Sequence, residues 1–450
     1  DQVGAEPLQK VEQEADLLRG DGPGESIVGA PAAGEAVVEI LEGFLGRESG
    51  LSVGRLTLMD VDPRRLRIVG GLARRMLDAA GSDIELRLST DRIEALEGAD
   101  YVLTQMRVGG SSARIRDERI PLKHGVVGQE TTGPGGFANA LRTIPVMLDV
   151  AADVRRAAPD ARWINFTNPS GLVTEAIRKH AGAEAIGLCN VPIGMQNAIA
   201  GLLGVEPLRV RLDYVGLNHL SWIRGVHLDG RDVIDDVIER AIAAGTCGPF
   251  APELLRTLRM LPNPYLDYYY NTDRVVREQR TAERTRGEVV RDVERDLLRM
   301  YENPALATKP KELEQRGGAH YSTAAVSLIR ALETDAGDVQ IVNTPNRGAI
   351  PDLPDDGVVE VPCVVGRHGA RPIPCAPLPA AIRGLVQSVK AYEELTVRAG
   401  AEGDERAALL ALAVHPLVPS FDAAKRLWAE IKEANAAELP QFAPAGRDRS

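Results

Sequence analysis

The chain has 450 residues, of which 44% are hydrophobic and 26% charged, and its formal net charge is −11. This composition is typical of a globular protein, and the length exceeds the size at which a single core stops growing, so we expect two domains. The acidic balance argues against nucleic acid as a partner, because binding to a phosphate backbone requires a basic face. No apolar run approaches the roughly 20 residues that span a bilayer, which argues against a membrane protein.

The four cysteines are widely spaced, without a C-x-x-C pair and without a secretory leader before them. We therefore expect reduced thiols in the cytoplasm rather than disulfides. Residues 1–24 are acidic and contain no strand pattern, which predicts a poorly ordered extension. We predict a Rossmann-like dinucleotide-binding domain at residues 25–195, an α+β substrate and metal domain at residues 196–440, and a loose tail at residues 441–450.

The first structured segment is Ile27–Gly34, a short apolar run followed by small residues, and a helical pattern continues over Glu35–Leu45. A strand, a small-residue turn and a helix open a dinucleotide-binding unit, in which the turn lets a pyrophosphate approach the helix N-terminus. Gly29 and Gly34 are the candidate cofactor contacts. The usual G-x-G-x-x-G pattern is absent, and Pro31 has no N–H to offer a phosphate, so we expect weak cofactor binding.

The second unit is an apolar strand, Leu56–Asp60, that ends in an acid. Asp60 lies about 26 residues after Gly34, which is roughly where a Rossmann fold places the carboxylate that holds the adenosine ribose. We predict this role for Asp60. The alternative is that Asp60 only caps the next helix, which Asp62-Pro63 opens.

Further strand patterns alternate with helical stretches. They recur at Ile84–Leu88, Tyr101–Met106, Trp163–Phe166 and Ala185–Leu188. This alternation predicts an α/β fold with a doubly wound, mostly parallel sheet. Ligands of such sheets bind beyond the carboxyl ends of the strands, and three of these strands deliver arginine, asparagine and cysteine to one edge. The residues are Arg107 and Arg114, Asn168, and Cys189 with Asn190.

Cys189 and His219 are the candidate metal ligands, because each lies beside an asparagine where an apolar run ends. At neighbouring strand ends, a thiolate and an imidazole can hold one divalent ion and leave coordination positions open to a substrate. Taken separately, such residues are more often a buried small hydrophobe and a hydrogen-bonded histidine. His124 and His320 are other possible ligands.

Beyond His219 the pattern changes to α+β. Val226–Val233 contains an Asp-Gly hairpin signal, and Leu261–Tyr270 is the densest aromatic cluster in a chain with only 4% aromatic residues. Most tyrosines in such clusters pack with a hydrogen-bonded tip. A tyrosine that follows Asn-Pro at a helix start, as Tyr265 does, can instead point into a cleft.

Five ordered motifs resemble those of glycoside hydrolase family 4. They are Gly128–Phe137, Asn165–Gly171, Gly187–Pro192, Gly216–Ser221 and Asn263–Leu266. The resemblance extends from about Glu39 to Ala437 and implies an architecture like that of lactate and malate dehydrogenases. It also implies NAD and Mn²⁺, or another divalent metal, as cofactors. Asn190, directly after the cysteine, is typical of the 6-phospho-β-glucosidase branch, whereas the α branch usually has aspartate there.

The resemblance implies hydrolysis of 6-phospho-β-glucosides, such as cellobiose 6-phosphate, by a redox-assisted elimination. NAD⁺ takes hydride from C3 of the sugar, a base removes the acidified C2 proton, the C1–O bond breaks, water adds and hydride returns. Cys189 and His219 are implied to bind the metal, and Tyr265 is implied to be the base. Because free tyrosine has a pKa near 10, a phenolate needs a nearby cation such as this metal.

The family contacts its sugar phosphate at the positions of Arg114, Asn168 and Arg286, and an arginine fork suits phosphate geometry. Surface salt bridges are the alternative role for these residues. Asn190 occupies the position at which some relatives place an acid for the leaving group. An amide cannot donate a catalytic proton as a carboxylic acid does, so water or another residue is the expected acid.

Two other functions stay open at this point. An NAD-dependent 2-hydroxyacid-type dehydrogenase shares the fold but produces NADH with each turnover. A non-catalytic sugar-phosphate or nucleotide sensor is favoured if the Gly29–Gly34 loop no longer binds the cofactor. The resemblance further implies a homodimer or homotetramer.

Overall fold

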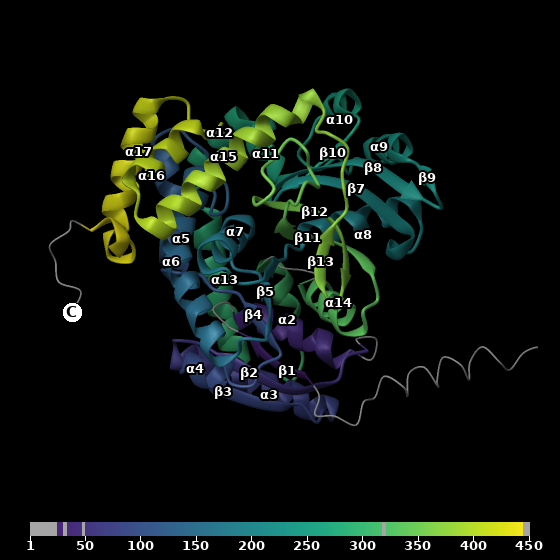
Figure 1. Cartoon of the computed structure of the whole chain (residues 1–450), viewed down its shortest axis with the longest axis vertical. Helices are drawn as coiled ribbons and strands as arrows, with labels where there is room; N and C mark the ends of the chain where they lie inside the picture. The colour runs from purple at the N-terminus through teal and green to yellow at the C-terminus, as the bar shows by residue number, and fades with distance from the viewer. Residues whose placement is uncertain (1–24, 30–33, 47–49, 317–320, 444–450) are drawn as a thin grey trace, which may run out of the picture.

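The computed structural model describes residues 25–29, 34–46, 50–316 and 321–443. The predicted extension at residues 1–24 and residues 444–450 of the predicted tail lie outside this range. In the N-terminal part, strands and helices alternate (Figure 1). They are β1 (Glu25–Gly29), α2 (Gly34–Leu45), β2 (Val53–Met59), α3 (Pro63–Ala80), β3 (Glu85–Ser89), α4 (Arg92–Leu96), β4 (Tyr101–Thr104), α5 (Gly110–Lys123), α6 (Gly133–Ala157), β5 (Arg162–Asn165), α7 (Ser170–Ala181), β6 (Ala185–Gly187) and α8 (Val191–Leu203).

The C-terminal part mixes hairpins with helices. Its first elements are η1 (Pro207–Arg209), β7 (Val210–Leu217), β8 (Leu220–Leu228), β9 (Arg231–Asp232), α9 (Ile234–Ala243), α10 (Pro252–Leu258), β10 (Leu261–Pro262), η2 (Pro264–Leu266), α11 (Asp267–Tyr270), α12 (Thr272–Thr281) and α13 (Arg286–Tyr301). The remainder are η3 (Lys311–Arg316), α14 (Tyr321–Thr334), β11 (Asp338–Pro345), β12 (Val358–Gly366), β13 (Gly369–Pro372), α15 (Ala380–Glu402), α16 (Glu405–Val414), α17 (Phe421–Ala434), η4 (Ala436–Glu438) and η5 (Pro440–Phe442).

The main sheet has nine strands in the order β13-β12-β11-β6-β5-β4-β1-β2-β3. The six strands from β6 to β3 are parallel, and the order reverses at β1, which pairs with β2 on one side and β4 on the other. This is the doubly wound arrangement, in which the crevice beyond β1 and β4 is the expected ligand position. The predicted α/β fold class is confirmed.

Strands β11, β12 and β13 extend the same sheet as an antiparallel edge, with β11 next to β6. Residues 338–372 therefore complete a sheet that begins at residue 25. The domain boundary at residues 195 and 196 remains a prediction, and the main sheet crosses it. Because β11 pairs with β6 through Asn343 and Gly187, which are far apart in the sequence, no local pattern could have placed these strands there.

A second sheet, of order β10-β8-β7 with β9 paired to β8, carries the predicted hairpin. Asp229 and Gly230 both have positive φ, 50° and 80°, as a two-residue type I′ turn requires. The hairpin predicted from this Asp-Gly pair is confirmed.

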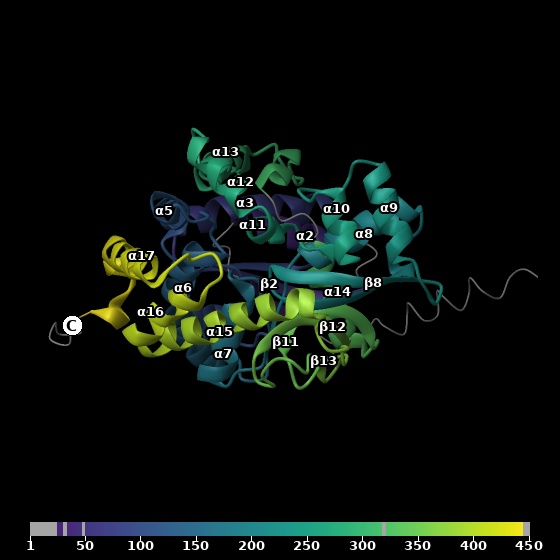
Figure 2. The same ribbon diagram turned by 90° about the horizontal axis from the view of Figure 1, so that it is seen from above.

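Helices cover both faces of the main sheet. Successive side chains of β1 point to opposite faces, so Ile27 belongs to the core under α2 and α3, whereas Val28 packs in a second cluster with residues of α4, α6 and α7. Figure 2 shows α3 and α13 on one side of the strands and α7 and α15 on the other. Among the helices that the structure describes, none is both long and apolar enough to cross a membrane.

His415 follows α16 and is held as a neutral imidazole. Its side chain is 1% exposed, and its Nδ1 accepts a hydrogen bond of 3.1 Å from the Leu417 N–H, which requires an unprotonated nitrogen. The ring packs against Tyr269 and Tyr392, whose own pKa values burial raises above the usual range. Burial lowers the pKa of His415 to about 3.

We expect this histidine to make the fold acid-sensitive. The folded-state pKa lies below the unfolded value of about 6.5, so the neutral ring stabilises the fold above pH 6.5, and this contribution is lost as the pH falls toward 3. Between pH 7 and pH 5, the unfolding free energy of the parent should fall by about 2 kcal/mol more than that of His415→Gln. Urea titrations at both pH values measure this difference. The exposed His227→Gln is the control, and an equal pH slope in His415→Gln and the parent would contradict the prediction.

Candidate active site

Cys189 and His219 meet beyond the carboxyl ends of the central strands. Cys189 follows β6, and His219 lies in the tight turn between β7 and β8, where Leu217 pairs with Leu220. The Cys189 Sγ is 3.5 Å from the His219 Nε2. His219 has φ of 63°, a left-handed conformation that is uncommon for a residue other than glycine and is found at functional sites.

Hydrogen bonding and stacking fix the orientation of the His219 ring. Its Nδ1 is 2.9 Å from the Thr131 Oγ1, so Nε2 is the nitrogen that faces Cys189. The opposite contact is Tyr265, whose ring stacks on the imidazole with centroids 3.7 Å apart and an interplanar angle of 8°. The three predicted residues Cys189, His219 and Tyr265 therefore form one cluster.

Burial opposes charge on both candidate ligands. It lowers the pKa of His219 to about 4, which keeps the imidazole neutral, and it raises the pKa of the Cys189 thiol. A neutral imidazole is ready to bind a metal, while a buried thiol becomes a thiolate only when a cation stabilises it. A sulfur and a nitrogen ligand at this spacing therefore fit a divalent transition-metal ion.

Two protein ligands leave most of the coordination sphere open. Among the residues that the structure describes, no group of three or more His, Cys, Asp and Glu side chains could hold a metal ion. His124 instead bonds Glu430 at 2.8 Å, and His320 lies outside the described residues. A metal held by Cys189 and His219 would thus have positions available for substrate oxygens or water, as catalysis requires.

Tyr265 lies in the short helical segment η2, which Asn263 caps. The Asn263 Oδ1 accepts a hydrogen bond of 3.0 Å from the Tyr265 N–H, and Pro264 provides the fixed φ that suits a helix start. Asn263 is fully buried, so this segment is anchored from beneath. The Asn-Pro-Tyr pattern places the Tyr265 phenol over the imidazole instead of in the core.

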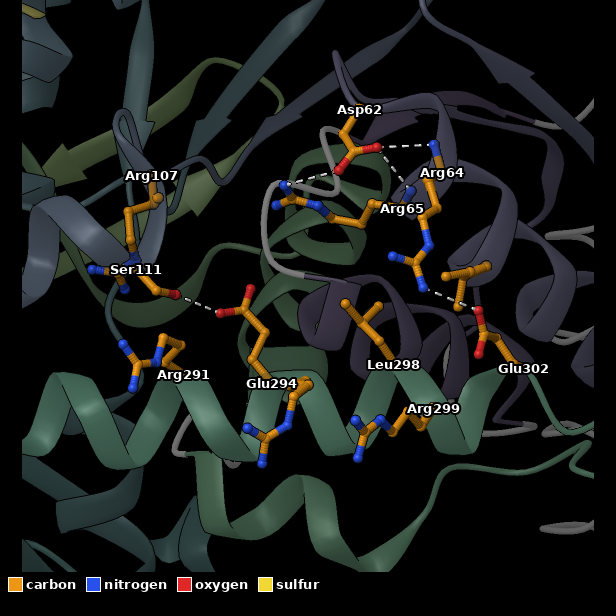
Figure 3. A pocket seen from close by; sticks show the side chains of 13 residues that line it. Asp62, Arg64, Arg65, Arg107, Ser111, Arg291, Glu294, Leu298, Arg299 and Glu302 are labelled. Atoms are coloured by element: carbon orange, nitrogen blue, oxygen red, sulfur yellow. Dashed lines mark hydrogen bonds and ion pairs between the residues drawn. The ribbon is translucent and has the colours of Figure 1, made fainter.

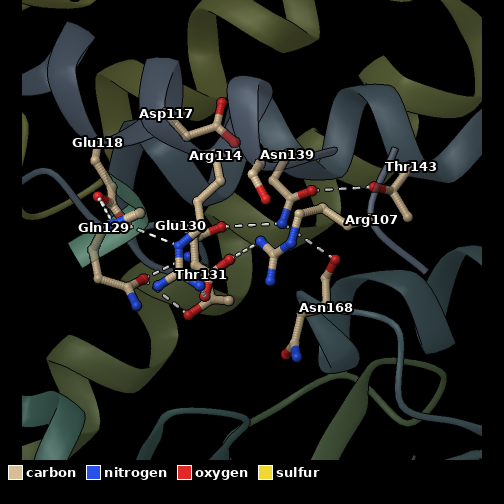
Figure 4. Close-up of polar contacts among 12 residues, drawn as sticks. Arg107, Arg114, Asp117, Glu118, Gln129, Glu130, Thr131, Asn139, Thr143 and Asn168 are labelled. Carbon is tan, nitrogen blue, oxygen red and sulfur yellow. Dashed lines mark hydrogen bonds and ion pairs between the residues drawn. The ribbon is translucent and has the colours of Figure 1, made fainter. Parts of the chain in front are cut away.

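A cluster of ion pairs lies next to this centre (Figure 4). Arg114 bonds Glu118 at 3.0 Å and Glu130 at 2.9 Å, and Arg107 also pairs with Glu130. The Gly287 N–H donates to the Glu118 Oε2 at 2.6 Å, so the backbone next to Arg286 reaches this cluster, while Arg286 itself is exposed.

Asn168 joins this cluster through Asn139. The Asn139 Nδ2 donates to the carbonyl oxygens of Glu130 at 3.1 Å and of Asn168 at 3.3 Å. The amide of Asn168 points away from that contact in Figure 4 and is available to a ligand. The structure therefore links Arg114 with Asn168, and it brings the backbone beside Arg286 close to Arg114.

Asp60 and Asp62 have separate positions. Asp62 is the N-cap of α3 and accepts hydrogen bonds from the Arg64 and Arg65 N–H groups. Asp60 is 5% exposed, its Oδ1 accepts from the Asp62 N–H at 2.8 Å, and its Oδ2 has no hydrogen-bond partner among the described residues but lies 3.6 Å from the Arg65 Nε. A buried carboxylate oxygen that still has room for a hydrogen bond at this position fits the hydroxyls of a ribose.

An arginine-lined cleft of about 450 Å³ continues from the start of α3 (Figure 3). Its basic residues come from α3, from the segment after β4 and from one face of α13, and they are Arg64, Arg65, Arg107, Arg291, Arg295 and Arg299. The acids in its lining are Asp62, Glu294 and Glu302. The cleft is thus locally basic in an acidic chain, which favours an anionic ligand.

The predicted cofactor turn has only its ends described. Gly29 is the last residue of β1, and Gly34 is the first residue of α2. Residues 30–33 lie outside the described residues. Strand, turn and helix nevertheless follow in the order that the sequence predicts, so the helix N-terminus lies beyond the central strand of the sheet.

Two family models match the chain over most of its length. One, described as Family 4 glycosyl hydrolase, matches residues 26–205, and the other, described as Family 4 glycosyl hydrolase C-terminal domain, matches residues 214–418. The chain belongs to glycoside hydrolase family 4. The family expected from the five sequence motifs is therefore confirmed.

Individual relatives of this family 4 chain agree with that assignment. A Bacillus subtilis protein named "Probable 6-phospho-beta-glucosidase" is 45% identical over 418 residues, which are 90% of this chain and 95% of the relative. A structure of the Thermotoga maritima 6-phospho-β-glucosidase with manganese, NAD⁺ and glucose-6-phosphate is 36% identical, with a TM-score of 0.86 over 92% of this chain and 99% of that one. A Cryptosporidium parvum malate dehydrogenase, 14% identical with a TM-score of 0.52 over 83% of this chain and 98% of that one, shares the fold, as expected.

Two residues of this family 4 site, Glu130 and Glu360, were not predicted individually from the sequence, and Arg107 was predicted only as a residue at the sheet edge. Arg107 and Glu130 pair beside Arg114, and Glu360 is a fully buried carboxylate on β12. Glu130 lies inside the Gly128–Phe137 motif, but its partners were unknown. For Glu360 the available signal was one acid in the apolar run Val358–Val361.

Proposed function

We propose that this chain hydrolyses 6-phospho-β-glucosides with the help of NAD and a divalent metal ion, Mn²⁺ in the relative of known structure. The observation that carries the proposal is the cluster of Cys189, His219 and Tyr265 beside Arg114 and its neighbours, at the strand ends of a dinucleotide-type sheet. The names of the relatives support the same substrate class.

The bound cofactors supply two functions that no side chain has, namely reversible oxidation at C3 of the sugar and Lewis-acid polarisation of its C2 and C3 oxygens. Cys189 and His219 hold the metal. Tyr265, stacked on the metal-binding imidazole, removes the proton from C2 as a phenolate. Because this ring stacks on the imidazole that would hold the metal, a bound cation would favour the phenolate.

Asn190 is proposed to contact the substrate at the leaving-group side. It stands at the N-cap position of α8, directly after Cys189. Because its amide has no acidic proton at neutral pH, we propose that water protonates the leaving oxygen and that Asn190 orients it.

Arg114, Asn168 and Arg286 are proposed to bind the 6-phosphate, with Arg114 as the buried member. Arg114→Lys keeps the charge but removes the planar fork that bonds Glu118 and Glu130. We expect KM for the phosphorylated substrate to rise about tenfold to a hundredfold, with a smaller change in kcat. Steady-state kinetics measures both constants. The exposed Arg209→Lys is the control, and an unchanged KM in Arg114→Lys would remove this residue from the phosphate site.

Gly29, Gly34 and Asp60 are proposed to bind NAD, with the adenosine end toward the arginine-lined cleft. Calorimetric titration of the purified chain with NAD⁺ tests this. We expect weak but measurable binding, because proline stands where backbone N–H groups usually meet the pyrophosphate. No heat at millimolar NAD⁺ would contradict the proposal.

The decisive experiment is hydrolysis of p-nitrophenyl-β-glucoside 6-phosphate with and without NAD⁺, Mn²⁺ and a reductant. We expect release only when the cofactors are present, and little release from the α-anomer or from the unphosphorylated glucoside. Release that is independent of both cofactors would contradict the mechanism. Net accumulation of NADH would point to a dehydrogenase, and binding without turnover to a sensor.

We further propose that the protein acts in the cytoplasm as a homodimer or homotetramer, with a phosphorylated sugar as its small-molecule partner. The free cysteines Cys189, Cys247, Cys363 and Cys375 agree with a reducing compartment. Light scattering coupled to size-exclusion chromatography gives the oligomer number, and a monomer would contradict that part of the proposal.

A further inference from the structure

Glu360 is a buried carboxylate behind the candidate metal centre. It is 0% exposed and lies on β12, directly opposite Asn343 of β11, which in turn pairs with Gly187 of β6, two residues before Cys189. Its Oε2 accepts a hydrogen bond of 2.6 Å from the Tyr214 hydroxyl, and its Oε1 accepts bonds from the Asn218 and Asn343 amides at 3.0 and 3.1 Å.

No lysine or arginine in the described part of the chain forms an ion pair with Glu360. Its partners are two amides and one phenol. A buried carboxylate without a cation is costly, because its desolvation is not offset by a charge of opposite sign. Glu360 lies near Cys189, so a metal ion bound by Cys189 and His219 would supply the missing positive charge.

One branch of the hydrogen-bond network leads to the candidate metal ligands. The Asn218 amide donates to the Glu360 Oε1 at 3.0 Å, and the same side chain lies beside the Cys189 thiol. Asn218 also precedes His219 in the tight turn between β7 and β8. Through this one amide, Glu360 therefore positions a side chain beside Cys189 and the turn that carries His219.

The other branch leads to the candidate base. The Ser221 Oγ lies 2.5 Å from the Tyr214 hydroxyl, and the Asn263 Nδ2 donates to Ser221 at 3.0 Å. The Asn263 Oδ1 then accepts the Tyr265 N–H at 3.0 Å. Because Tyr214 donates to Glu360, the hydroxyl of Ser221 donates to Tyr214, so the network has one consistent direction from Tyr265 to Glu360.

We propose that Glu360 is a positioning residue that links the two halves of the site, holding the His219 turn and the Tyr265 segment in one arrangement and favouring a cation at Cys189 and His219. This inference rests on the proposed metal site at Cys189 and His219, and it depends on the proposed catalytic activity for its kinetic consequences only. Glu360 contacts neither the substrate nor the reacting atoms in this role. Its effect on metal binding can be measured without substrate or NAD.

The test is the variant Glu360→Gln, in which the side chain keeps its shape, loses its charge and turns one acceptor into a donor. The affinity of the metal-free protein for Mn²⁺ is measured by titration followed with electron paramagnetic resonance. We expect this affinity to fall about tenfold to a hundredfold, as when other residues that orient metal ligands are replaced. NAD⁺ affinity, measured by calorimetry, should stay within about twofold.

Glu175→Gln is the matched control. Glu175 is also 0% exposed, and its Oε2 accepts a hydrogen bond from the Val358 N–H of the same strand, β12. Its charged partners are Lys179 and Lys390, and they do not belong to the candidate site. Glu175→Gln should lower the unfolding temperature but leave the Mn²⁺ affinity unchanged. An equal loss of Mn²⁺ affinity in both variants would mean a general loss of packing and would overturn the proposal.

Tyr214→Phe separates the two branches. It removes the hydroxyl that joins Glu360 to Ser221 and Asn263 but leaves the Asn218 bond in place. We expect kcat to fall about tenfold while the Mn²⁺ affinity changes by less than about threefold. If Glu360→Gln does not fold, Tyr214→Phe decides alone, and an unchanged kcat overturns the proposal. If Glu360→Gln folds and binds Mn²⁺ like the parent, the proposal is wrong, whether or not the chain hydrolyses phosphoglucosides.

Discussion

Replacing Cys189 by serine is expected to abolish the Mn²⁺-dependent hydrolysis. The Cys189 Sγ lies 3.5 Å from the His219 Nε2, and the two side chains are the only pair of protein ligands that we assign to the metal. Burial raises the pKa of the thiol, so the thiolate exists only with the cation bound. A serine hydroxyl is far less acidic than a thiol and would not become an anionic ligand.

The expected loss in kcat/KM is about a thousandfold or more. A Lewis-acid metal contributes several kcal/mol to transition-state stabilisation, and each 1.4 kcal/mol or so corresponds to a factor of ten in rate. Mn²⁺ titration and steady-state kinetics check the two parts of the prediction. Cys247→Ser, at a partly exposed site, is the control and should behave like the parent. Mn²⁺ affinity and activity that survive in Cys189→Ser would remove this residue from the metal site.

Replacing Tyr265 by phenylalanine is expected to lower kcat by about 10² to 10⁴, the range for removal of a positioned general base. The ring, its stacking on His219 and the backbone bond to Asn263 are all kept, so Mn²⁺ and NAD⁺ should bind as in the parent. The hydroxyl alone is lost, and with it the group that takes the C2 proton.

The partial reactions show which step is affected. In Tyr265→Phe, hydride transfer to NAD⁺ should persist, whereas exchange of the substrate C2 proton with deuterated solvent should become undetectable by NMR. Tyr270→Phe is the control on the same segment, because it removes a hydroxyl that bonds the Trp222 indole at 3.2 Å, outside the site. Rapid C2 exchange in Tyr265→Phe would show that another base performs this step.

Short stretches of the sequence determine the local elements of this protein. The Asp229-Gly230 pair predicts a hairpin because both residues tolerate positive φ, and both have it. The alternation of apolar runs and helical periods predicts the doubly wound parallel sheet, which the strand order confirms. Five motifs predict the family and bring Cys189, His219 and Tyr265 to attention before any contact is known.

The sequence does not determine which distant segments complete the sheet and the site. Strands β11 to β13 join the sheet of the N-terminal part through Asn343 and Gly187, and Glu360 meets Asn218 over a separation of 142 residues. Arg107, Glu130 and Glu118 likewise become neighbours only when α5, α13 and the Gly128–Phe137 loop pack together.

The physical reason is the range of the interactions. Helix periods, turns and caps depend on residues within a few positions of one another, so they can be predicted from a short window of the chain. The partners of a buried acid such as Glu360 have no local signature, because they come from two distant segments, β7 with the turn after it and β11. The ligand types and their motifs were therefore determined by the sequence alone, while only the tertiary structure decided which buried groups orient them, since burial and long-range pairing arise when the layers pack.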